Sequence, residues 1–266
     1  MNERSMFKLV SYGNSHPGKV RTHNEDAFLE LPEYGVWMVA DGMGGHSAGD
    51  VASQMLVDTV LEVVQQVPKG RLSIDLLSAA IQQANARIYE YGQRYQAGST
   101  VGSTAALLFI DNGLFHCLWA GDSRFYVLRQ GRLSQKSRDH SQVMDMVDEG
   151  TLALDEVESH PLSNVITRAV GVGRDLRLDQ VSGIVLPEDR FLLCSDGLNK
   201  ELSDEDILRC MDAESLTNAS LALLHSALVK GASDNVTTIL VDIAKANVES
   251  DGQKNDDTVP IFDAFG

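Results

Sequence analysis

Acidic side chains recur in this sequence where apolar stretches meet polar or glycine-rich turns. Asp26, Asp41, Asp196 and Asp234 each lie beside an apolar stretch, and Asp122 occupies a Gly-Asp-Ser segment. Taken one at a time, such acids are usually turn residues or helix caps. Carboxylate and carbonyl oxygens at strand ends also suit Mg²⁺ or Mn²⁺, which prefer octahedral oxygen coordination. Five acids in the same setting make a divalent metal centre a competing interpretation.

Residues 36–46, with the sequence VWMVADGMGGH, combine such an acid with a glycine turn. The apolar run before Asp41 predicts a strand buried on both faces, and a long amphipathic helix is expected directly after the turn. Gly42, Gly44 and Gly45 allow backbone approaches that a side chain would block. This turn can therefore bring a carboxylate and a backbone carbonyl to the same hard cation.

The surrounding chain predicts the elements that would position these acids. Strands at 26–31 and 36–41 are expected to pair as a hairpin, which brings Asp26 and Asp41 to one end of a sheet if the loop and the register permit. The other expected strands cover 7–12, 104–110, 114–120, 125–129, 190–195 and 236–243, and the expected helices cover 47–67, 73–95, 141–150, 215–230 and one that begins at Ser203. A turn is expected at 13–19, and irregular structure over most of 138–182. Without regular strand–helix alternation, a layered α+β sandwich is the predicted fold.

The composition narrows the classes of function. The chain has 266 residues, 43% hydrophobic and 23% charged, which is ordinary for a globular protein. A formal net charge of -16 argues against nucleic-acid binding and against adsorption to anionic membranes. A solvated acidic surface explains most of this charge. No signal peptide or membrane-spanning run is expected. Three cysteines without metal spacing fit a reduced cytoplasmic compartment.

Four motifs of other catalytic or cofactor-binding proteins are incomplete or absent. Residues 13–19 have the spacing of a P-loop, but Val20 follows where Ser or Thr would bind magnesium. The glycine turn at 42–47 has Ser47 in place of the third glycine of a dinucleotide motif. A cysteine phosphatase needs Arg six positions after its Cys, and the three cysteines are followed there by Ser123, Lys200 and Leu216. No Gly-x-Ser-x-Gly hydrolase motif occurs.

Eight short motifs occur in the order of a known family. They are RTHNED (21–26), VADGMGGH (39–46), GSTA (102–105), AGDSR (120–124), DHS (139–141), ITRAVG (166–171), CSDGL (194–198) and SDNVT (233–237). The chain resembles the metal-dependent Ser/Thr protein phosphatases of the PP2C (PPM) family in their compact bacterial form. Each motif alone is weak, whereas eight in order are highly specific.

The resemblance implies an α+β fold of four layers, an α-β-β-α sandwich with two antiparallel sheets packed face to face between helices. It implies a phosphatase domain at 7–244, with a flap near the active site at about 145–173. The remaining residues, 245–266, are polar and acidic and are expected to be disordered.

The resemblance also implies a centre of two Mn²⁺ or Mg²⁺ ions. By position, Asp41 would bridge both ions and Gly42 would lend its carbonyl oxygen to one. Asp196 and Asp234 would hold the first ion, and Glu25 would act through water near the second.

Three further acidic or amide residues are expected around these ligands. Asp122 matches an acid that binds a third ion in bacterial members, often together with the Asp196 position. Asp26 and Asn235 are expected behind the ligands, as supports.

The implied reaction is attack on phosphorus by a water that the two ions bridge. Arg21 matches the family arginine that grips the phosphate, and an exposed surface arginine is the alternative. Met43 stands where animal enzymes carry a histidine, so His46 is a candidate proton donor or phosphate contact. A solvent-exposed residue at a helix start is the alternative for His46, and a metal-bound water could supply the proton instead. In the flap, Asn164 and Arg168 could contact substrate or serve structure, and His160 matches a recurrent flap residue.

The predicted activity is hydrolysis of phosphoserine and phosphothreonine in proteins. We expect a monomer that binds neither nucleic acid nor membrane and that reverses a bacterial Ser/Thr kinase, acting on the kinase or its substrates. Control of a secretion system is one candidate role. A binding module on the same fold without activity is the non-enzymatic alternative, but such a module is expected to lose metal-binding acids, and Asp41, Asp196 and Asp234 are all present.

Overall fold

The structure is a computed structural model that describes residues 7–45, 48–95, 100–157 and 159–245. Two antiparallel sheets form its centre. The first sheet contains, in order, β1 (Phe7–His16), β11 (Val236–Lys245), β10 (Arg190–Cys194), β7 (Arg124–Arg129) and β8 (Arg132–Gln135). The second contains β2 (Asp26–Leu31), β3 (Val36–Met43), β5 (Ala105–Asp111), β6 (Leu114–Ala120) and β9 (Asp179–Ile184), and β4 (Gly102–Ser103) pairs with β3.

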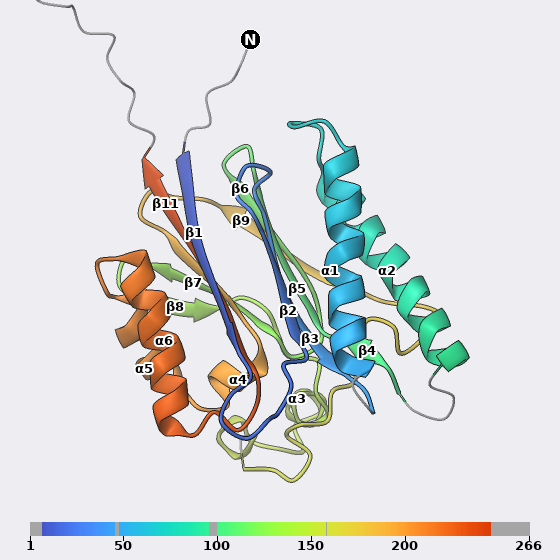
Figure 1. The fold of residues 1–266 in the computed structure, drawn as a ribbon. Helices are drawn as coiled ribbons and strands as arrows, with labels where there is room; N and C mark the ends of the chain where they lie inside the picture. Colours follow the sequence, from blue (N-terminus) through green and yellow to red (C-terminus); the bar gives the residue numbers. More distant parts are fainter. Residues whose placement is uncertain (1–6, 46–47, 96–99, 158, 246–266) are drawn as a thin grey trace, which may run out of the picture.

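Helices cover both outer faces of the two sheets. The helices are α1 (Ala48–Gln66), α2 (Ile74–Tyr95), α3 (Gln142–Asp148), α4 (Asp196–Asn199), α5 (Asp204–Met211) and α6 (Leu216–Lys230), with a short 3-10 helix at Leu154–Glu156. Figure 1 shows α1 and α2 against one sheet and α5 and α6 against the other. The predicted four-layer α-β-β-α sandwich is confirmed. No described helix combines the length and the apolar character needed to span a membrane.

The apolar strands divide their side chains between two layers of core. Phe191 and Leu193 of β10 face the second sheet, whereas Leu192 and Cys194 pack under α5 and α6. Successive strand residues point to opposite faces, so a strand buried on both sides must be apolar throughout. The same rule explains the continuous apolar run of β3, which contributes Trp37 to the layer between the sheets and Met38 to the layer under α1 and α2.

Local sequence signals account for several turns and helix ends. Asn112 and Gly113 have positive φ angles of 49° and 76°, as the two-residue hairpin between β5 and β6 requires. Ser203 and Asp206 form the capping box that begins α5.

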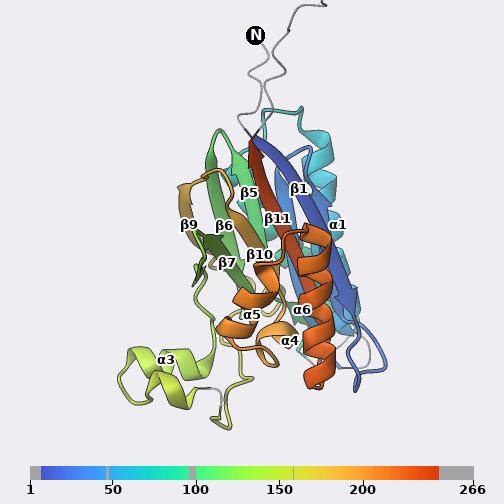
Figure 2. The same ribbon diagram turned by 90° about the vertical axis from the view of Figure 1, so that its left-hand side faces the viewer.

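Two predicted segments differ from the structure. The turn expected at 13–19 begins later, because the pairing of β1 with β11 continues to His16. Within 138–182, β9 adds an edge strand beside β6. The rest of that region, including α3, extends from one end of the sandwich (Figure 2). The flap limits stay a prediction. The tail predicted at 245–266 begins one residue too early, because Lys245 ends β11, and residues from 246 onward lie outside the described residues.

We predict that side chains packed between the two sheets contribute strongly to stability. Ile239 is fully buried there, whereas Ile184 on β9 is 64% exposed. Ile239→Ala is expected to lower the free energy of unfolding by about 2–5 kcal/mol, because it removes buried methyl groups and leaves a cavity. Ile184→Ala is the matched control and should change it by about 0.5 kcal/mol at most. Urea denaturation measures both, and equal losses would contradict this core assignment.

Candidate metal centre

The acids that the sequence singled out meet at one end of the sandwich. Antiparallel pairing brings the C-terminal ends of β3 and β10 to the same end as the N-terminal ends of β2 and β11, near α4 in Figure 1. A cavity of about 380 Å³ opens there. It is lined by Arg21, Glu25, Asp41, Gly42, Met43, Gly44, Thr104, Asp122, Asn164, Ile166, Asp196, Lys200, Asp234 and Asn235.

The backbone of Asp41 is held by Thr104. Its N–H donates to Thr104 Oγ1 at 2.9 Å, and its carbonyl oxygen accepts from the Thr104 N–H at 2.8 Å. Because Thr104 Oγ1 already accepts this bond, its hydroxyl proton is available to Ser123 Oγ at 2.7 Å. This chain of bonds ties Asp41 to the loop that carries Asp122.

The turn after Asp41 packs directly against α1. A Cβ atom on Gly42 would lie 2.0 Å from the carbonyl oxygen of Gly49, so the close approach requires glycine. The Gly42 N–H donates to the Glu25 carbonyl oxygen at 3.0 Å, and Ser53 Oγ donates to the same oxygen at 2.6 Å. Glu25 is therefore fixed beside Asp41 through its own backbone.

Asp196 and Asp234 are brought together by a second close approach. A Cβ atom on Gly197 would lie 2.0 Å from the Asn235 carbonyl oxygen. Asn235 Oδ1 accepts from the Glu25 N–H at 2.8 Å, and its amide group donates to the carbonyl oxygens of Pro17 and His23. Asn235 thus fastens the loop that carries Arg21 and Glu25 to the start of β11.

Asp26 lies behind the cavity rather than in its lining. It pairs with Asp41 in the β2–β3 register, which answers the question the sequence left open. Its Oδ2 accepts from Ser195 Oγ at 2.8 Å, next to Asp196. Burial raises the pKa of Asp26 to about 7, against the effect of its hydrogen bonds from Thr237 and Ser195.

The pKa values of three carboxyl groups that line the cavity are also raised, so their negative charge is disfavoured there. Burial raises the pKa of Asp122 to about 7, and the charge of Asp196 adds to the effect. Burial also raises the pKa of Asp41 well above its usual range, as do the neighbouring carboxylates of Asp26 and Asp196. Burial raises the pKa of Asp196, although Lys200 opposes the shift. The cavity is therefore short of positive charge.

Two side chains supply positive charge inside this cavity. Arg21 grips Asp234, with Nε 3.0 Å from Oδ1 and Nη2 3.0 Å from Oδ2. Lys200 contacts Asp196 Oδ2 and lies 3.6 Å from Asp234 Oδ2. Sequence reasoning missed Lys200, although its spacing of four residues from Asp196 could have indicated a helical pair.

The donor set fits hard divalent cations. Asp196 Oδ1 and Asp26 Oδ1 are buried without a hydrogen-bond partner among the described residues. Carboxylate and backbone oxygens dominate the lining, and neither His nor Cys is among its residues. As the side chains stand, no three acids, histidines or cysteines in the described part of the chain form a ready-made metal site.

Of the predicted residues that the structure describes, Arg168 and His160 are, like Asp26, absent from the cavity lining. Arg168 Nη1 donates to Asp179 Oδ1 at 2.8 Å and lies beside His140. His160 Nδ1 accepts from the Leu162 N–H within its own loop. His46 lies outside the described residues. Of the flap candidates, Asn164 lines the cavity.

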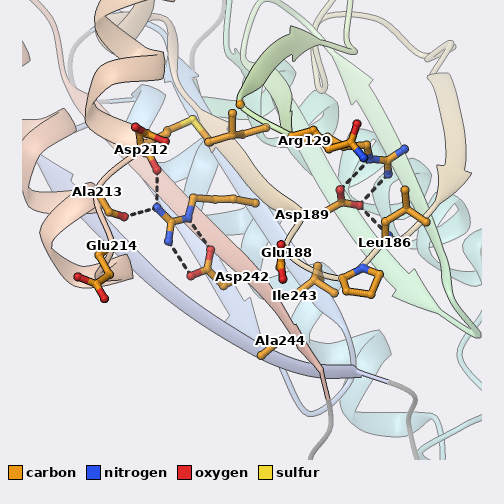
Figure 3. Close-up of a pocket in the computed structure, with 16 residues that line it drawn as sticks. Arg129, Leu186, Glu188, Asp189, Asp212, Ala213, Glu214, Asp242, Ile243 and Ala244 are labelled. Atoms are coloured by element: carbon orange, nitrogen blue, oxygen red, sulfur yellow. Dashed lines mark hydrogen bonds and ion pairs between the residues drawn. The ribbon is translucent and has the colours of Figure 1, made fainter.

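A larger cavity of about 650 Å³ lies at the opposite end of β10. Figure 3 shows that its two arginines point toward carboxylates. Arg190 Nε lies 2.6 Å from Asp242 Oδ1, and Arg129 Nη2 lies 2.7 Å from Asp189 Oδ2. Both arginines of this cavity are thus paired with carboxylates, and the cavity contains none of the acids that the sequence singled out.

Comparison with known proteins agrees with this architecture. A family model described as protein phosphatase 2C matches residues 12–228. The fold and the strand-end acids thus define a PP2C-type phosphatase domain, and the chain belongs to the protein phosphatase 2C family.

Bacterial Ser/Thr phosphatases are among the relatives. The serine/threonine protein phosphatase PstP of Mycobacterium tuberculosis is 36% identical over 232 residues, 86% of this chain and 44% of the relative. This chain therefore spans less than half the length of that relative.

Solved structures show the same similarity. PppA of Pseudomonas aeruginosa, a regulatory component of T6SS, is 40% identical with a TM-score of 0.80, covering 88% of this chain and 97% of PppA. The PstP catalytic domain in complex with two manganese ions is 32% identical with a TM-score of 0.80, covering 90% of this chain and 99% of that domain.

Asp26 makes the stability of the metal-free protein depend on pH. Because its pKa is raised from 3.8 to about 7 on folding, the folded state holds this proton more tightly than the unfolded state. The contribution of protonated Asp26 to the free energy of unfolding is fully present below pH 3.8 and is lost as the pH rises to about 7. In a chelator, Asp26→Asn should therefore raise the melting temperature relative to wild type by an amount that grows over this interval.

Asp58→Asn, at an exposed position on α1, is the control and should show no such trend. Thermal melts of the three proteins across the pH range measure the difference. A difference between Asp26→Asn and wild type that stays constant with pH would contradict the raised pKa of Asp26.

Proposed function

We propose that the chain is a phosphoprotein phosphatase that hydrolyses phosphoserine and phosphothreonine with the help of Mn²⁺ or Mg²⁺. The observation that carries the proposal is the single cavity in which partly buried acids from both sheets lie beside Arg21. Membership of the protein phosphatase 2C family supports it, as does the likeness to a manganese-bound catalytic domain.

The proposed ion ligands are the carboxylates of Asp41, Asp196 and Asp234 and the carbonyl oxygen of Gly42, with Glu25 acting through water. When bound, two divalent ions supply the positive charge that activates water and stabilises the phosphoryl oxygens. The chain fixes the positions of these ligands through the Thr104, Gly197 and Asn235 contacts, so little rearrangement of the backbone is needed. Preorganisation of this kind is a main source of catalysis in phosphoryl transfer.

Arg21 is the proposed phosphate ligand. Its guanidinium group can make two parallel hydrogen bonds to a phosphate, as it does to Asp234 here. The side chain is 52% exposed at the mouth of the cavity, so it can exchange Asp234 for an incoming phosphate. Arg21 would thereby orient the phosphate group toward the acids.

The leaving alkoxide of the substrate needs a proton. His46 stays the predicted donor, with a metal-bound water as its alternative. Asn164 lies at the cavity from the side of the predicted flap, where its amide could contact the peptide around the phosphorylated residue. Arg168 is held by Asp179, so we assign it to the structure of this segment rather than to substrate.

A cysteine nucleophile is disfavoured by the structure. Cys194 and Cys117 are buried, and burial raises the pKa of the Cys194 thiol to about 12. A reactive cysteine needs the opposite shift, because the thiolate is the nucleophile.

For the biological setting, we propose that the enzyme reverses a Ser/Thr kinase by acting on the kinase or its substrates. Similarity to PppA makes regulation of a secretion system one candidate role. The three free cysteines are consistent with a cytoplasmic location. A monomeric state stays a prediction.

Hydrolysis of a phosphothreonine peptide tests the proposal. We expect activity with Mn²⁺, none in a chelator, and a loss of about a hundredfold or more in Asp41→Asn and Asp196→Asn, because each removes a charged ligand. Asp212→Asn changes an exposed acid at the remote cavity and should retain wild-type activity.

Full activity in the chelator, or in both ligand variants, would contradict the metal mechanism. An inactive wild-type protein that still binds Mn²⁺ would instead indicate a binding module on the phosphatase fold.

A further inference from the structure

Lys200 is the less exposed of the two cations in the acidic cavity. Its side chain is 30% exposed, whereas that of Arg21 is 52% exposed. Lys200 follows α4 directly, and its N–H donates to the Asp196 carbonyl oxygen at 2.9 Å, which continues the helical pattern. Residues four apart on a helix lie on the same face, so the ammonium group stays within reach of the Asp196 carboxylate.

The backbone around Lys200 is fixed by the core. Leu198 and Leu202, on either side of it, are buried under α5 and α6, and the Leu202 N–H donates to the Leu198 carbonyl oxygen at 2.9 Å. Removal of Lys200 from the cavity would therefore require the extended ammonium side chain to turn toward solvent. Three carboxylates on the cavity side attract the ammonium group, so its turning toward solvent is not favoured.

Asp196 divides its two oxygens between different environments. Oδ2 contacts the Lys200 ammonium group, whereas Oδ1 is buried and has no partner among the described residues. Asp196 therefore has one oxygen available for a divalent ion and one already bound to a cation. The charge of Lys200 also acts on Asp122, where it lowers the pKa against the larger effect of burial.

The charge balance of the cavity favours two divalent ions over three. Five acids line it, Glu25, Asp41, Asp122, Asp196 and Asp234, and they outnumber the two cations by three charges. Two divalent ions bring four positive charges, one more than this deficit. Three divalent ions would bring six, which is three more than the deficit. Uncompensated like charges are costly in a partly buried site, where screening by water is weak.

We propose that the Lys200 ammonium group, which pairs with Asp196 and lies 3.6 Å from Asp234 Oδ2, is a fixed cation of the metal centre that supplies the positive charge a third divalent ion would bring to Asp122 and Asp196, and so limits the centre to two ions. This inference rests on the proposed function, and it opposes the third ion that the family resemblance implies for Asp122. Asp122 then serves as a counter-charge for Lys200 rather than as an ion ligand.

Counting bound manganese tests the proposal. Metal-free protein is titrated with Mn²⁺ at neutral pH, and free Mn²⁺ is measured by its electron paramagnetic resonance signal. Wild type should bind two ions and a third only weakly. Lys200→Met should bind a third ion about tenfold more tightly than wild type or better, since it removes a unit charge from the site. Lys200→Gln is a second neutral variant with the same expectation.

Three further variants locate the effect. Lys200→Arg keeps the charge and should bind two ions. Lys8→Met has the same change in net charge but lies on an exposed position of β1 opposite Ala244, and it should behave as wild type. The double variant Lys200→Met with Asp122→Asn should lose the added ion.

The outcomes separate this proposal from the proposed function. A wild-type protein that binds three ions with similar affinity overturns the role of Lys200, whether or not the variants fold. Unchanged affinity for a third ion in both neutral variants, or an added ion that persists without Asp122, also overturns it. A wild-type protein that binds no Mn²⁺ and hydrolyses no phosphopeptide would instead contradict the proposed function.

Discussion

The removal of several neighbouring carboxylates from water, at one end of the sandwich, is the constraint on which this structure depends. Asp41, Asp122 and Asp196 each lie where burial raises the pKa and where neighbouring acids raise it further. A group of this kind destabilises the folded chain unless positive charge enters it. Arg21 and Lys200 provide part of that charge, and divalent ions are the natural source of the remainder. Under the proposed function, the same imbalance would draw divalent ions into the site and let them hold a phosphate.

The backbone of the sandwich keeps the acids together despite this repulsion. Gly42 and Gly197 allow contacts that any side chain would prevent, and Asn235 ties the loop before β2 to the start of β11. Much of this could be predicted, because apolar runs that end in acid–glycine pairs mark strand ends. The hairpin that pairs Asp26 with Asp41 followed from two apolar runs around a turn, although its register required the structure.

Other features could not be predicted, because they depend on contacts between distant segments. Strand β9 is an edge strand with alternating exposure and an internal glycine, so its apolar signal is weak. Arg168 was a candidate either for substrate contact or for a structural role, and its partner Asp179 on β9 carried no motif that would have indicated the pair. Lys200 was overlooked because α4 is only four residues long. That Lys200 lies on the same side of this helix as the Asp196 side chain is clear only once the helix is known.

The most direct measurement is the anomalous scattering of manganese in crystals grown with Mn²⁺. The account predicts two manganese peaks on either side of the Asp41 carboxylate, one of them within coordination distance of Asp234 and of Asp196 Oδ1, with the Lys200 ammonium group still on Oδ2. Manganese absent from Asp41 would contradict it, as would manganese bound mainly at the remote cavity beside Asp242.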